Sequence, residues 1–374
     1  MATRGTPSHF NIGRGNGRGR GRGRGHTGRR GGGFSGRPLV RELHEGLDPS
    51  PLETLTTPED DPLTDYQITD LTYIGSYNWI DEQTNTIIVP AESKNELIDW
   101  TSVDFVTDRN NLRKLLQWVR SEAGKPFRID LQLAGNRTVL MSRWEARTAC
   151  WYNKDQNPTY GFNFEDATTQ PVRGCENAKA HHRIVKYELG IFTMVVRFEV
   201  DAYVPDAEAA VDPVTGSVDA LLEQMAGLSV SSASTTVTDA TIRVARGGEY
   251  VAQSTIAELT TRSETNSTYN WPRSYPQLYL SQTPHYHFAV HSKGKFIHLK
   301  KYDLQGIELE GEREKLQGDF RKLVAALTVI QDMVIAGGQE GRYSLIYENR
   351  ELKVYRRSRQ GNLLPDDVVT RFED

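Results

Sequence analysis

The chain of 374 residues contains little cysteine and no long hydrophobic run. Its two cysteines, Cys150 and Cys175, have neither metal-ligand spacing nor the number needed for a disulfide framework. This favours a reducing, intracellular compartment. No stretch approaches the roughly 18 apolar residues of a membrane helix. The N-terminus has no apolar segment either, so we expect neither a membrane span nor a secretory signal.

Acidic residues are absent from residues 1–38, which carry nine arginines. With those nine positive charges removed, the net charge of −4 becomes −13 for the rest of the chain. The arm is a glycine–arginine repeat with almost nothing apolar to bury, so we expect it to be disordered. Guanidinium groups on such a backbone reach phosphates and stack on bases. This favours contact with nucleic acid over a purely solubilising tail.

The motifs of several enzyme classes are missing as well. The sequence has no P-loop, no HExxH zinc motif, no nucleophile elbow and no dinucleotide-binding fingerprint. It has no internal repeat. Its catalytic chemistry, if it has any, must therefore come from side chains that are scattered along the sequence.

The composition divides the chain into three parts. After the arm, residues 39–65 are rich in proline, aspartate and threonine and are interpreted as a linker. Residues 66–374 are interpreted as one folded domain. Within it, residues 206–240 are rich in serine, threonine, alanine and aspartate, which predicts a partly disordered surface insertion.

Hydrophobic periodicity predicts a mixed α/β (α+β) domain with mostly antiparallel sheets and flanking helices. We expect helices at 104–124, 274–282 and 312–335. Strand-like patterns lie at 76–80, 85–90, 127–133, 138–144, 161–165, 182–190, 192–204, 254–261, 342–348 and 351–357, and a hairpin at 285–302.

Two carboxylates lie two residues apart on an expected strand. The side chains of Glu199 and Asp201 should therefore point to the same face. Neighbouring carboxylates repel each other, and a hard divalent cation such as Mg²⁺ or Mn²⁺ would neutralise them through oxygen ligands. For this pair alone, a solvated acidic face is the alternative.

Glu165 and Glu258 occur in similar settings. Glu165 ends the apolar stretch GFNF, and Glu258 follows the small apolar residues TIA. Together with Glu199 and Asp201, these residues could converge on one metal cluster. Such clusters hydrolyse phosphodiesters by activating a water molecule and stabilising the leaving oxygen.

Short motifs around these residues follow one another in a recognisable order. They are GFNFE (161–165), FEVD (198–201) and AELTT (257–261). They resemble, in this order, the Gly-Φ-x-Φ-Glu, Glu-Φ-Asp and Glu-Leu-Lys-Thr motifs of the decapping nuclease (DXO) family. Further similar stretches are FVTDRNNLRKLL (105–116), YELG (187–190) and YPQLYLSQTPHYHFAV (275–290), and SYNWI (76–80) with TIIVP (86–90) resembles fungal members. The likeness spans roughly residues 66–360.

The resemblance implies a PD-(D/E)xK nuclease-like core, two divalent ions (Mg²⁺ or Mn²⁺) and quality control of RNA 5′ ends. Members of this family release pyrophosphate from 5′-triphosphate RNA, remove incomplete or NAD caps, and digest RNA from 5′ to 3′. The likeness also implies nuclear residence, with the cytoplasm as a second location. A 5′–3′ exoribonuclease is an expected partner.

Residue roles carry over by position. The resemblance makes Glu165, Glu199, Asp201, Glu258 and the carbonyl of Leu259 the metal ligands. Arg109 and Gln277 would hold the 5′ phosphates or the attacked group. His182 lies where the family has a substrate-contacting side chain. The four carboxylates and Thr260 would form the catalytic set.

One departure concerns the reaction itself. Thr260 replaces the family's lysine, which orients the attacking water and offsets charge in the transition state. Losing one such stabilising group typically costs two or more powers of ten in rate. Lys300 or Lys301 is a candidate substitute. The alternative hypotheses are a catalytically weakened relative that binds RNA or scaffolds an exoribonuclease, and an RNA-binding scaffold that acts through its arm. The four costly acidic residues favour the hydrolase.

The arm hypothesis makes a testable prediction. Deleting residues 1–38 should weaken binding of single-stranded RNA and flatten its dependence on salt, because nine arginines are lost. Fluorescence anisotropy at several salt concentrations measures both quantities. An unchanged affinity would remove the arm from RNA binding.

Overall fold

The computed structural model describes residues 2–3, 40–81, 85–90, 98–146, 159–205, 242–266, 269–358 and 361–373. Almost all of the expected arm, the whole of the expected insertion at 206–240, and Cys150 lie outside these residues. Cys175 is a buried free thiol. Within the described residues, no helix is long and apolar enough to cross a membrane.

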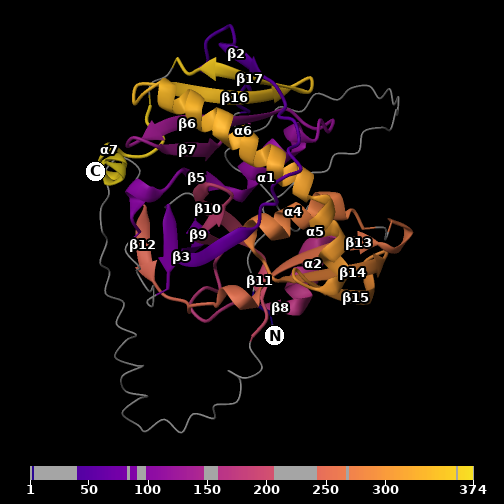
Figure 1. Ribbon diagram of the computed structural model, residues 1–374. Coiled ribbons are helices and arrows are strands. Elements are labelled where there is room, and N and C mark those ends of the chain that lie inside the picture. The colour runs from indigo at the N-terminus through magenta and orange to yellow at the C-terminus, as the bar shows by residue number, and fades with distance from the viewer. Residues whose placement is uncertain are drawn as a thin grey trace, which may run out of the picture.

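The larger of the sheets has the strand order β12-β4-β3-β9-β10-β5-β7-β6-β16-β17-β2 (Figure 1). These strands are β2 (Glu53–Leu55), β3 (Ile68–Asp81), β4 (Thr86–Val89), β5 (Phe105–Asp108), β6 (Phe127–Ala134), β7 (Thr138–Arg143), β9 (Ala180–Leu189), β10 (Phe192–Val200), β12 (Arg243–Arg246), β16 (Arg342–Glu348) and β17 (Glu351–Arg356). Strand β5 is parallel to both of its neighbours, β10 and β7, and β12 is parallel to β4. The other pairs are antiparallel, so the sheet is mixed.

A second sheet has the order β11-β13-β14-β15. It comprises β11 (Ala202–Tyr203), β13 (Ile256–Ser263), β14 (His285–Ser292) and β15 (Lys295–Asp303). Strands β14 and β15 form the expected hairpin, with Lys293 and Gly294 at positive φ in its turn. The chain passes from the first sheet to the second at Asp201, between β10 and β11. Strands β1 (Ala2–Thr3) and β8 (Thr169–Gln170) pair with each other in a separate two-stranded sheet.

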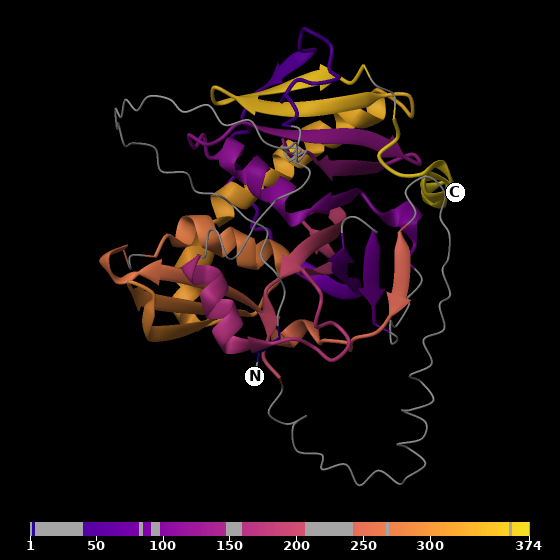
Figure 2. The same ribbon diagram turned by 180° about the vertical axis from the view of Figure 1, so that it is seen from behind.

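Helices flank the sheets, which confirms the mixed fold class. They are α1 (Arg109–Val119), α2 (Tyr160–Thr168), α4 (Trp271–Ser281), α5 (Glu310–Lys315), α6 (Gln317–Ala336) and α7 (Asp366–Val369). Figure 1 shows α6 crossing one face of the large sheet near α1. Figure 2, from the opposite side, shows α2 lying against the second sheet.

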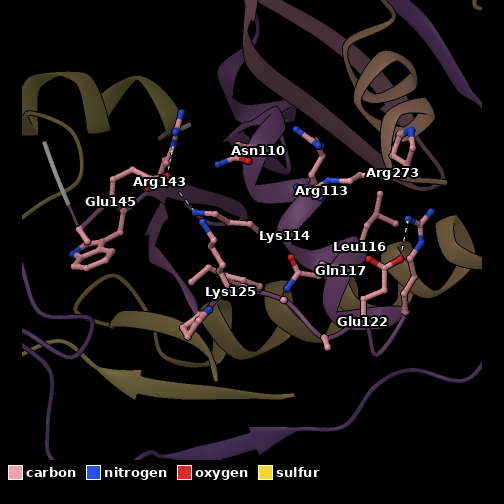
Figure 3. Close-up of a pocket in the computed structure, with 18 residues that line it drawn as sticks. Asn110, Arg113, Lys114, Leu116, Gln117, Glu122, Lys125, Arg143, Glu145 and Arg273 are labelled. Atoms are coloured by element: carbon pink, nitrogen blue, oxygen red, sulfur yellow. Dashed lines mark hydrogen bonds and ion pairs between the residues drawn. The ribbon is translucent and has the colours of Figure 1, made fainter. Parts of the chain in front are cut away.

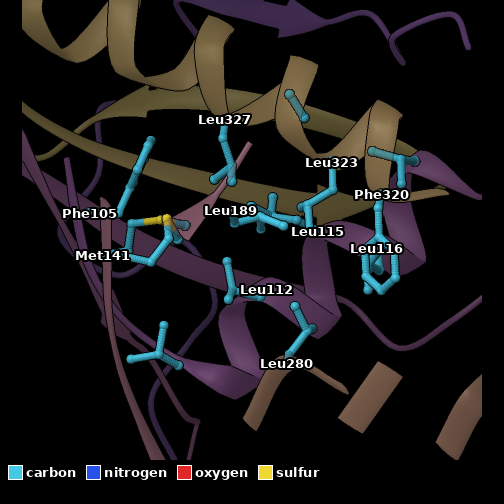
Figure 4. Packing of buried hydrophobic residues seen from close by; sticks show 14 of the residues in the cluster. Phe105, Leu112, Leu115, Leu116, Met141, Leu189, Leu280, Phe320, Leu323 and Leu327 are labelled. Atoms are coloured by element: carbon cyan, nitrogen blue, oxygen red, sulfur yellow. The ribbon is translucent and has the colours of Figure 1, made fainter. Parts of the chain in front are cut away.

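The main hydrophobic core fills the space between α1, α6 and the large sheet (Figure 4). Leu112, Leu115 and Leu116 of α1 recur at helical spacing and are at most 1% exposed. They meet Phe320 and Leu323 of α6, which are fully buried. Burial of one such side chain contributes about 1.5–3 kcal/mol. This packing fixes α1 firmly, so its first residue has a defined position.

Two predicted elements were wrong in type or extent. The helix expected at 104–124 begins only at Arg109, because Phe105–Asp108 pairs as β5 and the Asp108 side chain caps the helix by accepting from the Asn110 amide. The stretch 161–165 is not a strand. It belongs to α2, which begins where Thr159 accepts a hydrogen bond from the Phe162 amide.

Two smaller differences concern boundaries. Residues 53–55, inside the expected linker, form the edge strand β2, where Leu55 is buried against β17. The helix expected at 312–335 is divided at Leu316 into α5 and α6. The strand expected at 192–204 is divided at Asp201 into β10 and β11, which belong to different sheets. The remaining expected strands and the helix at 274–282 are present, with ends shifted by a few residues and with β3 extended towards its N-terminus.

Candidate functional site

Asp201 lies at the junction of the two sheets. Val200 ends β10 in the large sheet, and Ala202 pairs with Ala257 of β13 in the second sheet. Asp201 itself is only 6% exposed, and its Oδ2 accepts a hydrogen bond from the Leu259 amide at 2.8 Å. This bond joins the end of β10 to β13.

Three other carboxylates raise the pKa of Asp201 through their charge. Burial raises the pKa of Asp201 well above its usual range, and the charges of Glu258, Glu165 and Glu199 raise it further. The hydrogen bond from the Leu259 amide opposes them. The four acidic residues singled out in the sequence therefore share one electrostatic neighbourhood, although they come from α2, β10, β13 and the junction.

Glu165 reaches this neighbourhood from α2. Its neighbour Phe164 packs with Ala257 and Leu259 of β13, so one face of the helix is held against the second sheet. Glu165 is 4% exposed. A helix, rather than the expected strand, thus supplies this carboxylate.

Glu258 points to a different side of β13. Side chains alternate along a strand, so Glu258 faces away from the contact of Leu259 with α2. Its carboxylate accepts from Arg109 Nη1 at 3.3 Å and from the amide nitrogen of Gln277. Arg109 Nη1 also donates to Ser281 Oγ at 3.2 Å. The two residues expected to hold phosphates therefore meet at Glu258, one from α1 and one from α4.

The donor chemistry at this site suits a hard divalent cation. All four side chains offer carboxylate oxygens, and mutual repulsion in a buried place favours a neutralising cation. However, in the part of the chain that the structure describes, no group of three His, Cys, Asp or Glu side chains is placed to hold a metal ion. Glu258 is held towards α1 and α4 by Arg109 and Gln277, so a cation would have to compete with Arg109 for Glu258.

His182 lies beside the acidic residues. It is directly opposite Glu199 in the β9–β10 pair, and its ring stacks on Tyr77 with centroids 4.9 Å apart. Burial and the charge of Arg197 together lower the pKa of His182 to about 4. The ring is therefore neutral at neutral pH and can both donate and accept a hydrogen bond.

Thr260 lies on the same face of β13 as Glu258, two residues further on. Its hydroxyl hydrogen-bonds the side chain of Tyr286, which also accepts from the Tyr269 hydroxyl. Lys300 and Lys301 are exposed on β15, and β14 separates them from β13. The position of the family's lysine is thus occupied by neutral hydroxyl groups.

Two arginines near the site were missed in the sequence. Arg197 lies on the same face of β10 as Glu199 and pairs with Asp108 at 2.9 Å. Arg113 follows Arg109 by one helical turn, and burial and the charge of Arg109 lower its pKa to about 10. Spacing of two on a strand and of four on a helix would have indicated both residues.

A family model described as a domain of unknown function (DUF8563) matches residues 92–372. No curated protein sequence matches the chain.

Several solved structures have a similar fold. Rai1 of S. pombe aligns with a TM-score of 0.52 and 11% identity, covering 81% of this chain and 99% of Rai1. Rai1 of Candida albicans, solved in complex with pU5 and Mn²⁺, aligns with a TM-score of 0.51 and 11% identity, covering 86% and 98%. S. pombe Rai1 in complex with 3′-FADP aligns with a TM-score of 0.51 and 12% identity, covering 81% and 99%. The chain therefore shares its fold with these Rai1 structures, which confirms the mixed fold class that the sequence predicted.

The repulsion between Asp201 and its neighbouring carboxylates leads to a prediction about the stability of the fold. Replacing Asp201 with asparagine keeps an acceptor for the Leu259 amide but removes one of four neighbouring negative charges. In EDTA at neutral pH, Asp201→Asn should raise the free energy of unfolding by on the order of 1 kcal/mol. Urea denaturation measures it, with Asp332→Asn, at an exposed position of α6, as the control. A loss of stability would mean that the carboxylates do not repel as described.

Proposed function

The chain belongs to the family described as a domain of unknown function (DUF8563), and we propose that it is a divalent-metal-dependent hydrolase that acts on RNA 5′ ends. The observation that carries this proposal is that the charges of Glu165, Glu199 and Glu258 all act on buried Asp201. Arg109, at the start of a helix, binds Glu258 of this set. The shared fold of the Rai1 structures supports it.

Each residue of the site has a role in this proposal. Glu165, Glu199, Asp201 and Glu258, with the carbonyl of Leu259, would hold Mg²⁺ or Mn²⁺, with two ions by the family likeness. Bound ions would supply charge stabilisation and an activated water.

Arg109 and Gln277 would hold the 5′ phosphates. Arg109 is the first residue of α1, where the helix dipole also favours an anion. A phosphate that takes over the hydrogen bonds of Arg109 releases Glu258 for the cation, because Arg109 and Gln277 now bind Glu258. Neutral His182 would contact the terminal nucleotide.

The proposal extends to the setting of the reaction. The arginine-rich arm would attract RNA, and the likeness favours a nuclear location and a 5′–3′ exoribonuclease partner. The C. albicans Rai1 structure, which contains pU5 and Mn²⁺, is the nearest chemical parallel for such a complex among the structures compared above.

The decisive test is an activity assay. We expect the protein to process at least one of 5′-triphosphate, 5′-monophosphate and capped RNA in Mg²⁺ or Mn²⁺, and EDTA to abolish this activity. Glu199→Ala/Asp201→Ala should lower the rate by at least two powers of ten, because it removes two of the four carboxylates. Gel electrophoresis of end-labelled RNA measures both.

The control is Asp332→Ala/Glu340→Ala, which removes two exposed carboxylates and should retain full activity. If the wild type leaves every substrate intact, the hydrolase proposal is wrong. The alternative hypothesis, a catalytically weakened relative that binds RNA or scaffolds an exoribonuclease, would then be favoured, and Thr260 supports it.

Thr260 provides a second prediction. A lysine at this position would place a cation two residues from Glu258 on the same face of β13. We therefore expect Thr260→Lys to raise the hydrolysis rate by about one to two powers of ten. Single-turnover kinetics at saturating metal measures the change.

The matched control is Thr261→Lys, which puts the same charge on the opposite face of β13. Equal gains from both variants would indicate a general effect of charge on RNA binding. No gain from Thr260→Lys would show that the site does not lack a cation beside the hydroxyl groups of Tyr286 and Tyr269.

A further inference from the structure

A cavity of about 530 Å³ opens between α1, the residues that follow α1, the end of β7 and the start of α4 (Figure 3). Six positively charged residues line it, against two acidic ones. The basic residues are Arg113, Lys114, Arg120, Lys125, Arg143 and Arg273, and the acidic ones are Glu122 and Glu145. We call this the basic cavity.

Arg120 pairs with Asp319 at 2.7 Å and with Glu122 at 3.7 Å. The other acidic residue of the lining, Glu145, does not balance the charge of the other five basic residues. Glu145 is shared by Lys114 at 3.5 Å and Arg143 at 2.7 Å. Burial lowers the pKa of Lys114, and Arg143 lowers it further against the opposing charge of Glu145. Burial likewise lowers the pKa of Arg113, with Arg109 and Arg273 contributing. The cations of the basic cavity therefore crowd one another, and an anion would relieve that repulsion.

The basic cavity continues directly from the candidate site. Arg109 of α1 and Gln277 of α4 bind Glu258. Arg113 and Arg273 lie four residues away from them on the same two helices, and both line the cavity. Four residues are about one helical turn, a rise of roughly 6 Å. The two helices thus present two successive levels of phosphate-binding side chains, the first at the carboxylates and the second in the cavity.

The aromatic side chains of the cavity are not available for stacking on bases. Arg41 lies over the ring of Trp144 at 4.8 Å, and Arg128 at 5.5 Å. Lys114 lies 5.8 Å from the ring of Phe127. The ligand is therefore recognised by charge rather than by its bases, which indicates a backbone contact without sequence preference.

We propose that the basic cavity binds the phosphates of single-stranded RNA that follow the 5′-terminal nucleotide. This inference rests on the proposed function, which places the 5′ end at Arg109 and Gln277. The RNA then leaves the site between α1 and α4, over Arg113 and Arg273, and continues past Lys114 and Lys125. The cavity supplies affinity that grows with RNA length, and it leaves the chemistry at the carboxylates unchanged.

The test compares RNA length. Lys125→Ala/Arg273→Ala removes two exposed cations of the cavity without touching the buried core. Lys353→Ala/Arg356→Ala, on β17 near the far edge of the large sheet, is the matched control. Binding of 5′-monophosphorylated RNAs of ten and of two nucleotides is measured by anisotropy and competition in EDTA, so that no cleavage occurs.

We expect the cavity variant to weaken binding of the ten-nucleotide RNA about tenfold and to leave the dinucleotide within twofold of wild type. The slope of log K against log salt should fall in magnitude by about 1.4, since each phosphate contact on a single strand contributes about 0.7. The control variant should change neither quantity.

Three outcomes would overturn the proposal. They are unchanged binding of the longer RNA, equal losses for both RNA lengths, and a loss of binding to polyglutamate alone, which would assign the cavity to an acidic peptide. The assay is independent of hydrolysis. If the wild type binds RNA through the cavity but does not cleave it, only the proposed function is contradicted. If the wild type cleaves RNA and the cavity variant binds RNA as well as the wild type does, only this inference is contradicted.

Discussion

The repulsion between buried Asp201 and the carboxylates of Glu165, Glu199 and Glu258 is the constraint on which the rest of the site depends. Burying one carboxylate beside others is unfavourable, and here the sheet junction forces it: Asp201 is the residue between β10 and β11 and is tied to the Leu259 amide. The fold offsets part of this cost with a cation. Arg109 pairs with Glu258, whereas Asp201 and Glu165 face each other's charge in a buried setting.

Helix α1 connects this constraint to the rest of the molecule. Its apolar face, with Leu112, Leu115 and Leu116, is locked against α6. Asp108 caps its first turn and forms an ion pair with Arg197. Burial alone would raise the pKa of Asp108, but the charge of Arg197 more than offsets this, so the pKa lies below its usual value. A rigidly packed helix therefore carries Arg109 at its start. The polar face of the same helix carries Arg113 and Lys114, which line the basic cavity. Core packing and the proposed anion binding therefore both depend on α1.

Periodicity predicted most strands and helices because each buries a regular apolar face. It failed where short-range capping decided the outcome. Phe105–Asp108 continues without a break into α1, and only the pairing of β5 with β10 and the Asp108 cap show where the strand ends. GFNFE alternates like a strand, yet Thr159 starts a helix there, and α2 gains its stability from packing on β13.

The sequence singled out the carboxylates of the candidate site as a hypothesis, but it did not predict their geometry. Ordered motifs selected the four carboxylates, and the structure brings them into one electrostatic neighbourhood. No spacing in the sequence shows that Glu258 turns to Arg109 and Gln277, because these contacts join residues 149 and 19 positions apart. The basic cavity was missed for the same reason. Its cations come from α1, the residues after it, β7 and α4, and the sequence does not show that these segments meet.

The position of Glu258 implies an order to events at the site. A cation and Arg109 cannot both take the full charge of this carboxylate, and a phosphate is a better partner for Arg109 than a carboxylate already shared with Gln277. Under the proposed function, substrate and metal therefore favour each other, since the phosphate removes the competitor of the metal for Glu258. Thermodynamic linkage makes this reciprocal, so that metal bound at Glu258 leaves Arg109 available to RNA. The ion pair between Arg109 and Glu258 then belongs to the substrate-free state, and binding of the RNA phosphate makes Glu258 available to the metal.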